Sequence, residues 1–187
     1  MKNIKFYPTI WQTIPYSFEL IDRWDNEGKQ VLDMVLKNKY ASEKGVSEML
    51  LNTIRCTAFD TKGREHFIAE FPEQFVLNLK GLHTGLFVKS KSVLKLSEGE
   101  YTTFRFYLNK TGNVFSFKDR SKEMVNRFDY LDFEIENGLN IDGEEAPEAI
   151  LRFDFTPYTF NSYFKSVLQI FKRPKLLKVK LANSLEN

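Results

Sequence analysis

Hydrophobic and polar residues alternate with a period of two through much of the chain, most clearly at its centre, in YTTFRFYLNKTGNVFSFK (residues 101–118). Phe104, Phe106 and Leu108 lie on one face of the run before the turn-forming residues 109–113, and Phe115 and Phe117 lie on one face of the run after them. Alternation on both sides of a Gly-containing turn is typical of a β-hairpin with one face in a core. The pattern therefore predicts an antiparallel hairpin centred on residues 109–113.

The same alternation predicts further strands before and after this segment. The predicted strands are 50–58 and 67–71, joined by a turn at 60–63, then 75–80 beyond Pro72, short strands at 86–88 and 93–96, 128–136, and 150–155. Asn137-Gly138 is the strongest two-residue hairpin signal in the chain. At the N-terminus, residues 2–10 and 16–24 are expected to form an extended arm, which Pro8 and Pro15 interrupt.

Three segments show helical patterns instead. Val31, Leu32, Val35 and Leu36 recur at i, i+1, i+4 and i+5, which predicts a helix over residues 28–40, followed by a loop at 41–45. Ser121 is a candidate N-cap for a single helical turn over 121–127. A broad apolar stripe then predicts a C-terminal helix that ends at Arg173-Pro174; its members are Phe160, Phe164, Val167, Leu168 and Phe171.

Together these elements indicate a mainly β (α+β) fold. About eight to ten short, consecutive antiparallel strands predict an antiparallel β-sandwich or an open barrel, with one helix in the N-terminal half and one at the C-terminus. We expect a β-rich body with its N-terminal arm over residues 1–156, and an amphipathic helix with a basic tail over residues 157–187.

The composition agrees with a globular protein of this kind. The chain has 187 residues, of which 42% are hydrophobic and 28% charged, enough to bury a substantial core. Cys56 is the only cysteine, so no intrachain disulfide can form. The N-terminus has no continuous apolar segment typical of a signal peptide, and no apolar run is long enough for a transmembrane helix. We therefore expect a cytoplasmic or virion-associated protein.

Charge is distributed unevenly along the chain. Residues 161–187 contain six bases and one acid, a net charge of +5, whereas residues 1–160 contain 21 bases and 24 acids, a net charge of −3. Residues 129–148 hold eight acids and no Lys or Arg. The candidate partner-binding residues are therefore Phe160, Phe164, Lys165, Phe171, Lys172, Arg173, Lys175 and Lys178 in the C-terminal segment, and Asp142, Glu144 and Glu145 in the acidic one.

No sequence motif predicts an active site. The chain lacks a phosphate-binding GxxxxGK[ST] loop, a GxGxxG fingerprint, a GxSxG elbow and an HExxH zinc motif, so no catalytic, cofactor-binding or metal-binding residue is assigned. His66 and His83 do not have the spacing of a zinc site. Cys56 alternates with apolar residues, which favours a buried structural thiol, and its distance from the turn at 60–63 does not place it clearly opposite His66.

These observations favour a non-enzymatic interaction or assembly protein, such as a structural component of a phage or another multi-subunit particle. Its partner is expected to be a protein subunit, either a second copy or another chain. Two alternatives remain: a peripheral membrane protein that binds anionic lipid through the basic C-terminal helix, and a small-ligand binder or enzyme with an aromatic pocket that uses His66 or His83. Nucleic acid is disfavoured, because basic and aromatic residues are interleaved only near the C-terminus.

Overall fold

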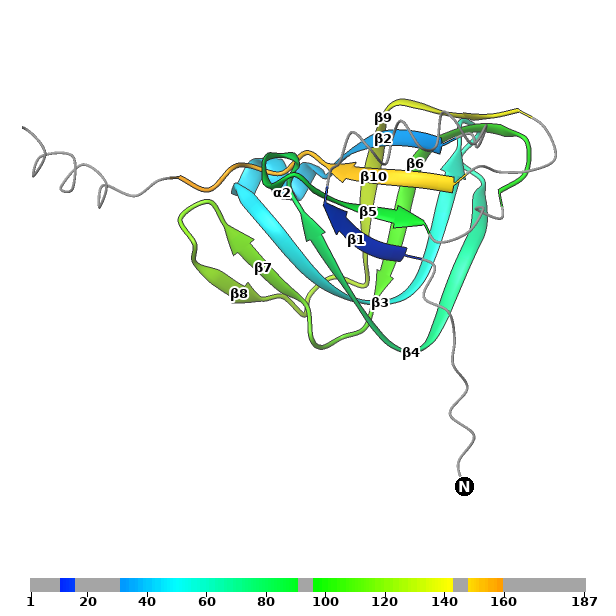
Figure 1. Ribbon diagram of the computed structural model, residues 1–187. Coiled ribbons are helices and arrows are strands. Elements are labelled where there is room, and N and C mark those ends of the chain that lie inside the picture. Colours follow the sequence, from blue (N-terminus) through cyan, green and yellow to red (C-terminus); the bar gives the residue numbers. More distant parts are fainter. Residues whose placement is uncertain (1–10, 16–30, 91–95, 143–147, 160–187) are drawn as a thin grey trace, which may run out of the picture.

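The computed structural model describes residues 11–15, 31–90, 96–142 and 148–159. All ten strands in these ranges belong to one curled, open sheet with the shape of a half-barrel (Figure 1). The strands are Trp11–Pro15 (β1), Val31–Lys37 (β2), Val46–Asp60 (β3), Glu65–Lys80 (β4), Leu86–Ser90 (β5), Gly99–Leu108 (β6), Val114–Phe117 (β7), Lys122–Met124 (β8), Tyr130–Ile141 (β9) and Glu148–Phe153 (β10). The mainly β class is thus confirmed, as an open sheet and not as a two-sheet sandwich.

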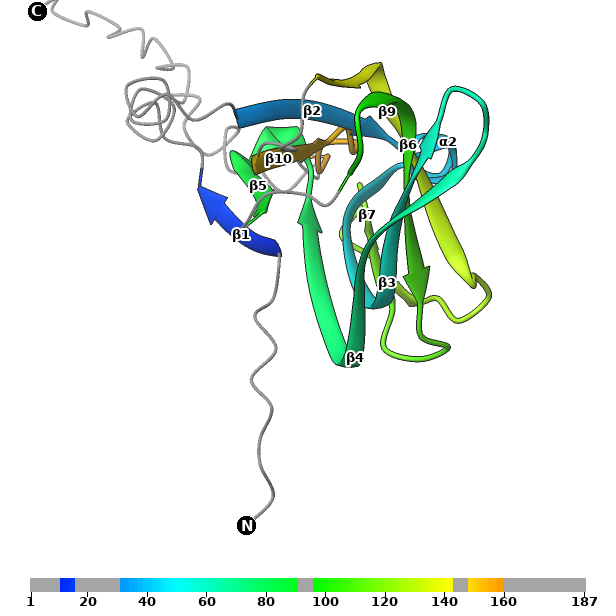
Figure 2. The same cartoon turned by 90° about the vertical axis from the view of Figure 1, so that its right-hand side faces the viewer.

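The order of the strands is β1-β5-β10-β2-β9-β6-β3-β7-β8, with β4 paired along the other side of β3. Neighbouring strands are antiparallel except for β10 and β2, which are parallel. In Figure 1, β2, β10, β5 and β1 lie in front of β9 and β6, and in Figure 2, β10, β5 and β1 lie to the left of β3, β6 and β9. Gly81, directly after β4, forms a bridge with Phe153 at the end of β10, so the curl brings distant parts of the sheet order together.

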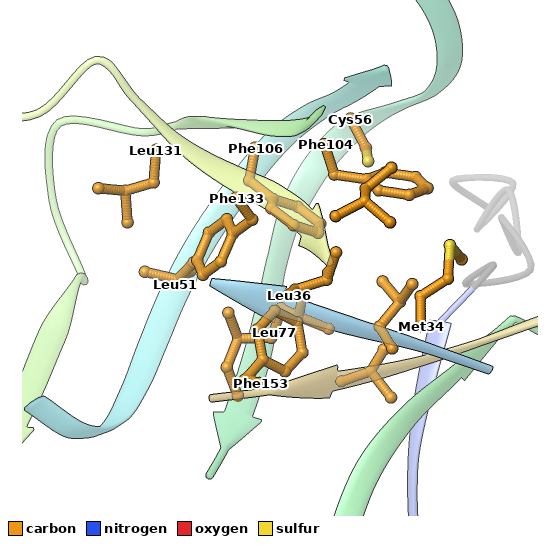
Figure 3. Packing of buried hydrophobic residues seen from close by; sticks show 14 of the residues in the cluster. Met34, Leu36, Leu51, Cys56, Leu77, Phe104, Phe106, Leu131, Phe133 and Phe153 are labelled. Atoms are coloured by element: carbon orange, nitrogen blue, oxygen red, sulfur yellow. The ribbon is translucent and has the colours of Figure 1, made fainter. Parts of the chain in front are cut away.

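The inner side of this curl is filled by aromatic and aliphatic side chains (Figure 3). Alternate residues of β6 and β9 point inward, as the sequence pattern predicts: Phe104 and Phe106 from β6, Leu131 and Phe133 from β9. Phe133 lies at the centre, and its ring packs edge-on against Phe106 at 5.5 Å and Phe153 at 5.3 Å between ring centroids. The interior of the half-barrel is therefore a packed core.

The predicted turn at residues 60–63 joins β3 and β4 and is confirmed. The two strands predicted on either side of Pro72 are instead one 16-residue strand, β4, interrupted by a bulge. Thr53 faces Phe75 and Arg55 faces Glu70, so the single residue between them on β3 faces residues 71–74 of β4. A bulge accommodates Pro72 because a proline has no backbone N–H for the regular ladder.

The hairpin predicted over residues 101–118 is wrong, because β6 and β7 do not pair with each other. Both are antiparallel to β3: β6 lies along residues 53–60 of β3, and β7 lies along residues 46–50. The chain leaves the sheet at residues 109–113 and then continues in the same direction beside β3. Each run keeps its predicted inward face, but the turn-forming residues make an excursion instead of a reversal.

Hydrogen bonds to β3 hold this excursion in place. The amide of Asn109 donates to the carbonyl of Asn52 (2.8 Å), and the Asn52 side chain donates to the carbonyl of Thr111 (2.9 Å). The buried Asn113 side chain accepts from the Asn52 amide (2.8 Å) and donates to the carbonyl of Asn109 (2.7 Å). Gly112 has a φ of 85°, a left-handed conformation that glycine adopts without strain. These contacts replace the strand pairing that a hairpin would provide.

Two further predicted turns are also wrong. Asn137-Gly138 does not reverse the chain but forms a bulge within β9, with φ angles of 65° and 70°. Tyr101 of β6 faces Leu139 and Thr103 faces Glu134, so β9 has extra residues between these two pairs that have no partner on β6. On the other side of β9, Ile135 pairs with Leu36 of β2. The helical turn predicted over residues 121–127 contains strand β8, which pairs with β7.

The helix predicted over residues 28–40 is wrong over residues 31–37. Residues 31–37 form β2, which lies between β10 and β9, with Met34 and Leu36 buried. A short apolar run such as residues 31–36 fits a buried strand between two others as well as a helix. Its pairing with β10 and β9, and not its spacing, decides which of the two forms. The helix α2 (Lys39–Lys44) follows, with Asn38 as its N-cap and Gly45 as its left-handed C-cap, where a loop was predicted.

The last described residues, as far as Thr159, are bound to the sheet. The alternation over 150–155 is confirmed, although β10 itself ends at Phe153. The amide and hydroxyl of Thr159 both donate to the carbonyl of Lys118, at 2.8 and 2.9 Å. The predicted C-terminal helix, the predicted strands 2–10 and 16–24, and all but one residue of the predicted strand 93–96 lie outside the described residues.

The central position of Phe133 predicts a large effect of its removal. Phe133→Ala should lower the free energy of unfolding by about 3–5 kcal/mol, because it removes a buried ring and leaves a cavity. The matched control is Phe67→Ala: Phe67 is 55% exposed, and its loss should change the free energy by no more than about 0.5 kcal/mol. Urea unfolding of both variants measures the difference, and equal effects would contradict this description of the core.

The role of Asn113 is tested in the same way. Asn113→Ala should cost about 1–3 kcal/mol, because the buried amide of Asn52 loses its acceptor. Lys110→Ala, in the same excursion but 70% exposed, is the control and should cost far less. If the two variants unfold at the same urea concentration, Asn113 does not hold the excursion.

Candidate functional site

The outer side of β4, β3, β6 and β9 carries a regular array of large polar and aromatic side chains. Strand registers align these residues in three rows: Glu70–Arg55–Tyr107–Tyr130, Phe67–Thr57–Arg105–Asp132 and Glu65–Phe59–Thr103–Glu134. All except Thr57 are at least partly exposed. We call this surface the arginine–tyrosine face and define it by these twelve residues.

Two arginines on this face are stacked on aromatic rings. The guanidinium carbon of Arg55 lies 3.9 Å from the ring centroid of Tyr107. The guanidinium carbon of Arg105 lies between two rings, 3.8 Å from the centroid of Tyr130 and 4.5 Å from that of Phe59. Cation–π contacts of this geometry hold a guanidinium group flat against a ring.

Carboxylates also hold Arg105 and Tyr107 in place through hydrogen bonds. Asp132 accepts two hydrogen bonds from Arg105, from Nε at 2.6 Å and from Nη2 at 2.8 Å, and this interaction raises the pKa of Arg105 above its ordinary value. Glu65 accepts from the Tyr107 hydroxyl (2.6 Å) and from Thr57 (2.8 Å). These bonds, the one from Tyr107 foremost, lower the pKa of Glu65, so its carboxylate stays ionised at neutral pH.

A hollow of about 350 Å³ adjoins the β9 edge of this face. Tyr130, Asp132 and Glu134 of the face contribute to its wall. The other lining residues are Lys37, Asn38, Lys39, Arg127, Phe128, Asp129 and Leu131. A hollow beside exposed aromatic and charged side chains is a common feature of protein-binding surfaces, where it takes up an anchoring side chain.

A second cavity, of about 380 Å³, lies where the β3–β4 turn meets the start of β6. Asp60, which is 7% exposed, organises the turn on one side of this cavity. Its Oδ1 accepts from the amides of Lys62 (2.9 Å) and Arg64 (2.8 Å), and its Oδ2 accepts from Arg64 Nε (2.7 Å). His66 Nε2 donates to the same Oδ2 at 3.1 Å.

Burial of the Asp60 carboxylate would by itself raise its pKa. The hydrogen bonds from Arg64, His66 and Lys62 outweigh that effect and hold the pKa well below the ordinary range. Both carboxylate oxygens are occupied by groups of the turn itself. The arrangement therefore stabilises the hairpin, and it leaves no oxygen directed at a ligand.

The two histidines pack against aromatic rings of the described part of the chain. No hydroxyl or thiol of the described residues hydrogen-bonds to His66, whose ring packs edge-on against Tyr101. Cys56 faces Ala69 on β4, whereas His66 faces Ala58, so the two are not opposite each other. The predicted buried thiol is confirmed: Cys56 is fully buried, which raises its pKa. His83, in the 3-10 turn Leu82–Thr84 (η1), packs against the Tyr158 ring.

Within the described ranges, no group of three or more His, Cys, Asp or Glu side chains is placed to hold a metal ion. In the same ranges, no helix is long and apolar enough to cross a membrane.

Most of the partner-binding residues predicted from the sequence lie outside the described ranges. These are Phe160, Phe164, Lys165, Phe171, Lys172, Arg173, Lys175, Lys178, Glu144 and Glu145. Asp142 is described; it is exposed and accepts a hydrogen bond from the Asn140 side chain at 2.9 Å. The sequence patterns did not predict the arginine–tyrosine face. The only signal in the sequence was the alternation of outward polar and inward apolar positions over residues 101–107 and 130–134.

Much of the acidic stretch that begins at Asp129 is paired within the body. Asp129 forms an ion pair with Lys110, and Asp132 with Arg105. Glu136 forms one with Lys37 at 2.7 Å, and this contact raises the pKa of Lys37. The stretch therefore presents less unpaired negative charge than its composition indicates. Glu134 of β9 also lies on the arginine–tyrosine face, and it forms no ion pair within the described residues.

Comparisons with known proteins find no matching family model, no matching curated protein and no matching solved structure.

The hydrogen bonds of Asp60 predict how stability depends on pH. Because its pKa is lower in the folded state, its contribution is complete above the unfolded pKa of about 4 and is lost as the pH falls toward the folded value. Asp60→Asn should lower the unfolding midpoint at pH 7 and flatten the fall in stability below about pH 4.

Thermal unfolding followed by circular dichroism between pH 7 and pH 2.5 measures this dependence. The control is Asp142→Asn; Asp142 is exposed and accepts a hydrogen bond from the Asn140 side chain. It should leave both the midpoint and the slope unchanged. An unchanged acid slope in Asp60→Asn would show that other carboxylates determine it.

Proposed function

We propose that this protein is a non-enzymatic interaction or assembly protein, and that it binds a protein partner through the arginine–tyrosine face. The observation that carries the proposal is the fixed stack of Arg105 between Tyr130 and Phe59, with Asp132 holding the guanidinium in place. A phage or another multi-subunit particle is one setting for such a protein.

The composition of the face supports this function. Tyr, Phe and Arg are enriched at the centres of protein interfaces, whereas Lys is depleted there, and the twelve residues of the face include six Tyr, Phe or Arg residues and no Lys. Two of the aromatic residues are strongly exposed, Phe67 at 55% and Tyr130 at 43%. Exposed aromatic side chains next to fixed charges are typical of a binding surface.

Site-specific photocrosslinking in cells that produce the protein tests this proposal. The full chain carries p-benzoylphenylalanine at position 67, on the face, or at position 124 as the control; Met124 is 69% exposed and lies on β8. We expect discrete protein adducts from position 67, with a several-fold lower yield from position 124. Tyr130→Ala should reduce the adducts of position 67, because it removes one of the two rings that hold Arg105.

The outcome is informative in either direction. Adducts at equal yield from both positions, or no adduct from position 67, would contradict the proposal. Each variant is first checked by thermal unfolding, so that a lost adduct is not mistaken for a lost fold.

A further inference from the structure

We propose that the arginine–tyrosine face binds the basic C-terminal segment, residues 161–187, of a second copy of this chain. This inference rests on the proposed function and names its partner. The contact is head to tail: one copy contributes the sheet face and the next contributes the segment. Such a contact uses two different surfaces, so it builds rings or open filaments of identical subunits.

The charge of the face favours a basic partner. Four carboxylates and two guanidinium groups give it two excess negative charges: Glu65, Glu70, Asp132 and Glu134 against Arg55 and Arg105. Glu70 and Glu134 are exposed and form no ion pair within the described residues, although Lys37 of β2 lies opposite Glu134 in the strand register. Lysine side chains that reach the face would meet these two carboxylates and the exposed rings of Phe67 and Tyr130.

The C-terminal segment has the complementary chemistry. Residues 161–187 carry a net charge of +5 and several apolar residues, among them Phe164 and Phe171. Apolar and basic groups together match a face on which aromatic rings and carboxylates alternate. The acidic stretch at 129–148 is a weaker alternative, because Asp129, Asp132 and Glu136 already pair with bases of their own chain.

The position at which the segment leaves the body favours a second copy. Thr159 is bound to the carbonyl of Lys118, directly after β7. β7 pairs with residues 46–50 of β3, whereas the arginine–tyrosine face covers residues 55–59 of the same strand. In Figure 1 residues 154–159, which follow β10, extend on the side of β7, away from the β3–β4 turn. The last described residue thus lies near the opposite end of β3 from the face.

Sedimentation velocity on the full chain at low and high salt tests the inference, with two charge-reversal variants. The face variant is Glu70→Lys with Glu134→Lys, and the tail variant is Lys172→Glu with Lys175→Glu and Lys178→Glu. We expect the unmodified chain to self-associate at low salt and to dissociate at high salt. Each variant alone should associate at least about tenfold more weakly, because like charges then face each other.

An equimolar mixture of the two variants is the decisive sample. The reversed face of one and the reversed tail of the other are complementary again, so the mixture should recover association. Recovery also shows that both variants are folded. The control, Glu43→Lys with Glu123→Lys, changes the net charge equally on α2 and β8 and should behave like the unmodified chain.

Other outcomes would overturn the inference. A chain that is monomeric at both salt concentrations, or a tail variant that associates as the unmodified chain does, excludes this contact between copies. If the chain is monomeric but still crosslinks to a different protein at position 67, the contact between copies is excluded and the proposed function stands. If the chain is monomeric and forms no such crosslink, both proposals are contradicted.

Discussion

Strand β3 is the element on which the rest of the sheet depends. It pairs with β4 along one side and with β6 and then β7 along the other, so a single 15-residue strand determines the register of three others. The arrangement requires a connection between β6 and β7 that does not reverse the chain and that is held against β3 without strand pairing. Asn52 and Asn113 meet that requirement, since their side chains and backbone bind the excursion at 109–113 directly to β3.

Which face of each strand is buried could be predicted from the sequence, but which strands pair could not. The inward positions Phe104, Phe106, Leu131 and Phe133 follow from alternation alone and are all buried. Alternation is the same whether the next strand reverses or continues, so residues 109–113 and Asn137-Gly138 both look like turns. The contacts that decide the outcome join residues distant in sequence: Asn113 binds Asn52 of β3, and β9 pairs with β6 both before and after Asn137-Gly138.

The candidate site shows the same limit. In the sequence, Arg105 and Tyr107 are simply the outward positions of an alternating strand. Because they alternate with the buried Phe104 and Phe106, the pattern predicts that they are exposed and nothing more. Three strand registers bring them beside Arg55, Tyr130 and Asp132, and only then does a stacked array exist. A surface assembled across four strands leaves no local motif. The charge asymmetry between the body and the C-terminal segment, by contrast, is visible in the composition.

The fixed geometry of Arg105 also bears on how strongly the face could bind. A free arginine or lysine loses rotamer entropy when a partner immobilises it, at a cost of about 0.5–1.5 kcal/mol for each side chain. Arg105 is already held by two rings and by the two hydrogen bonds that it donates to Asp132, so most of that cost is met when the protein folds. A surface prepared in this way can form a stable contact with a modest area, because less of the interaction energy is used to order it.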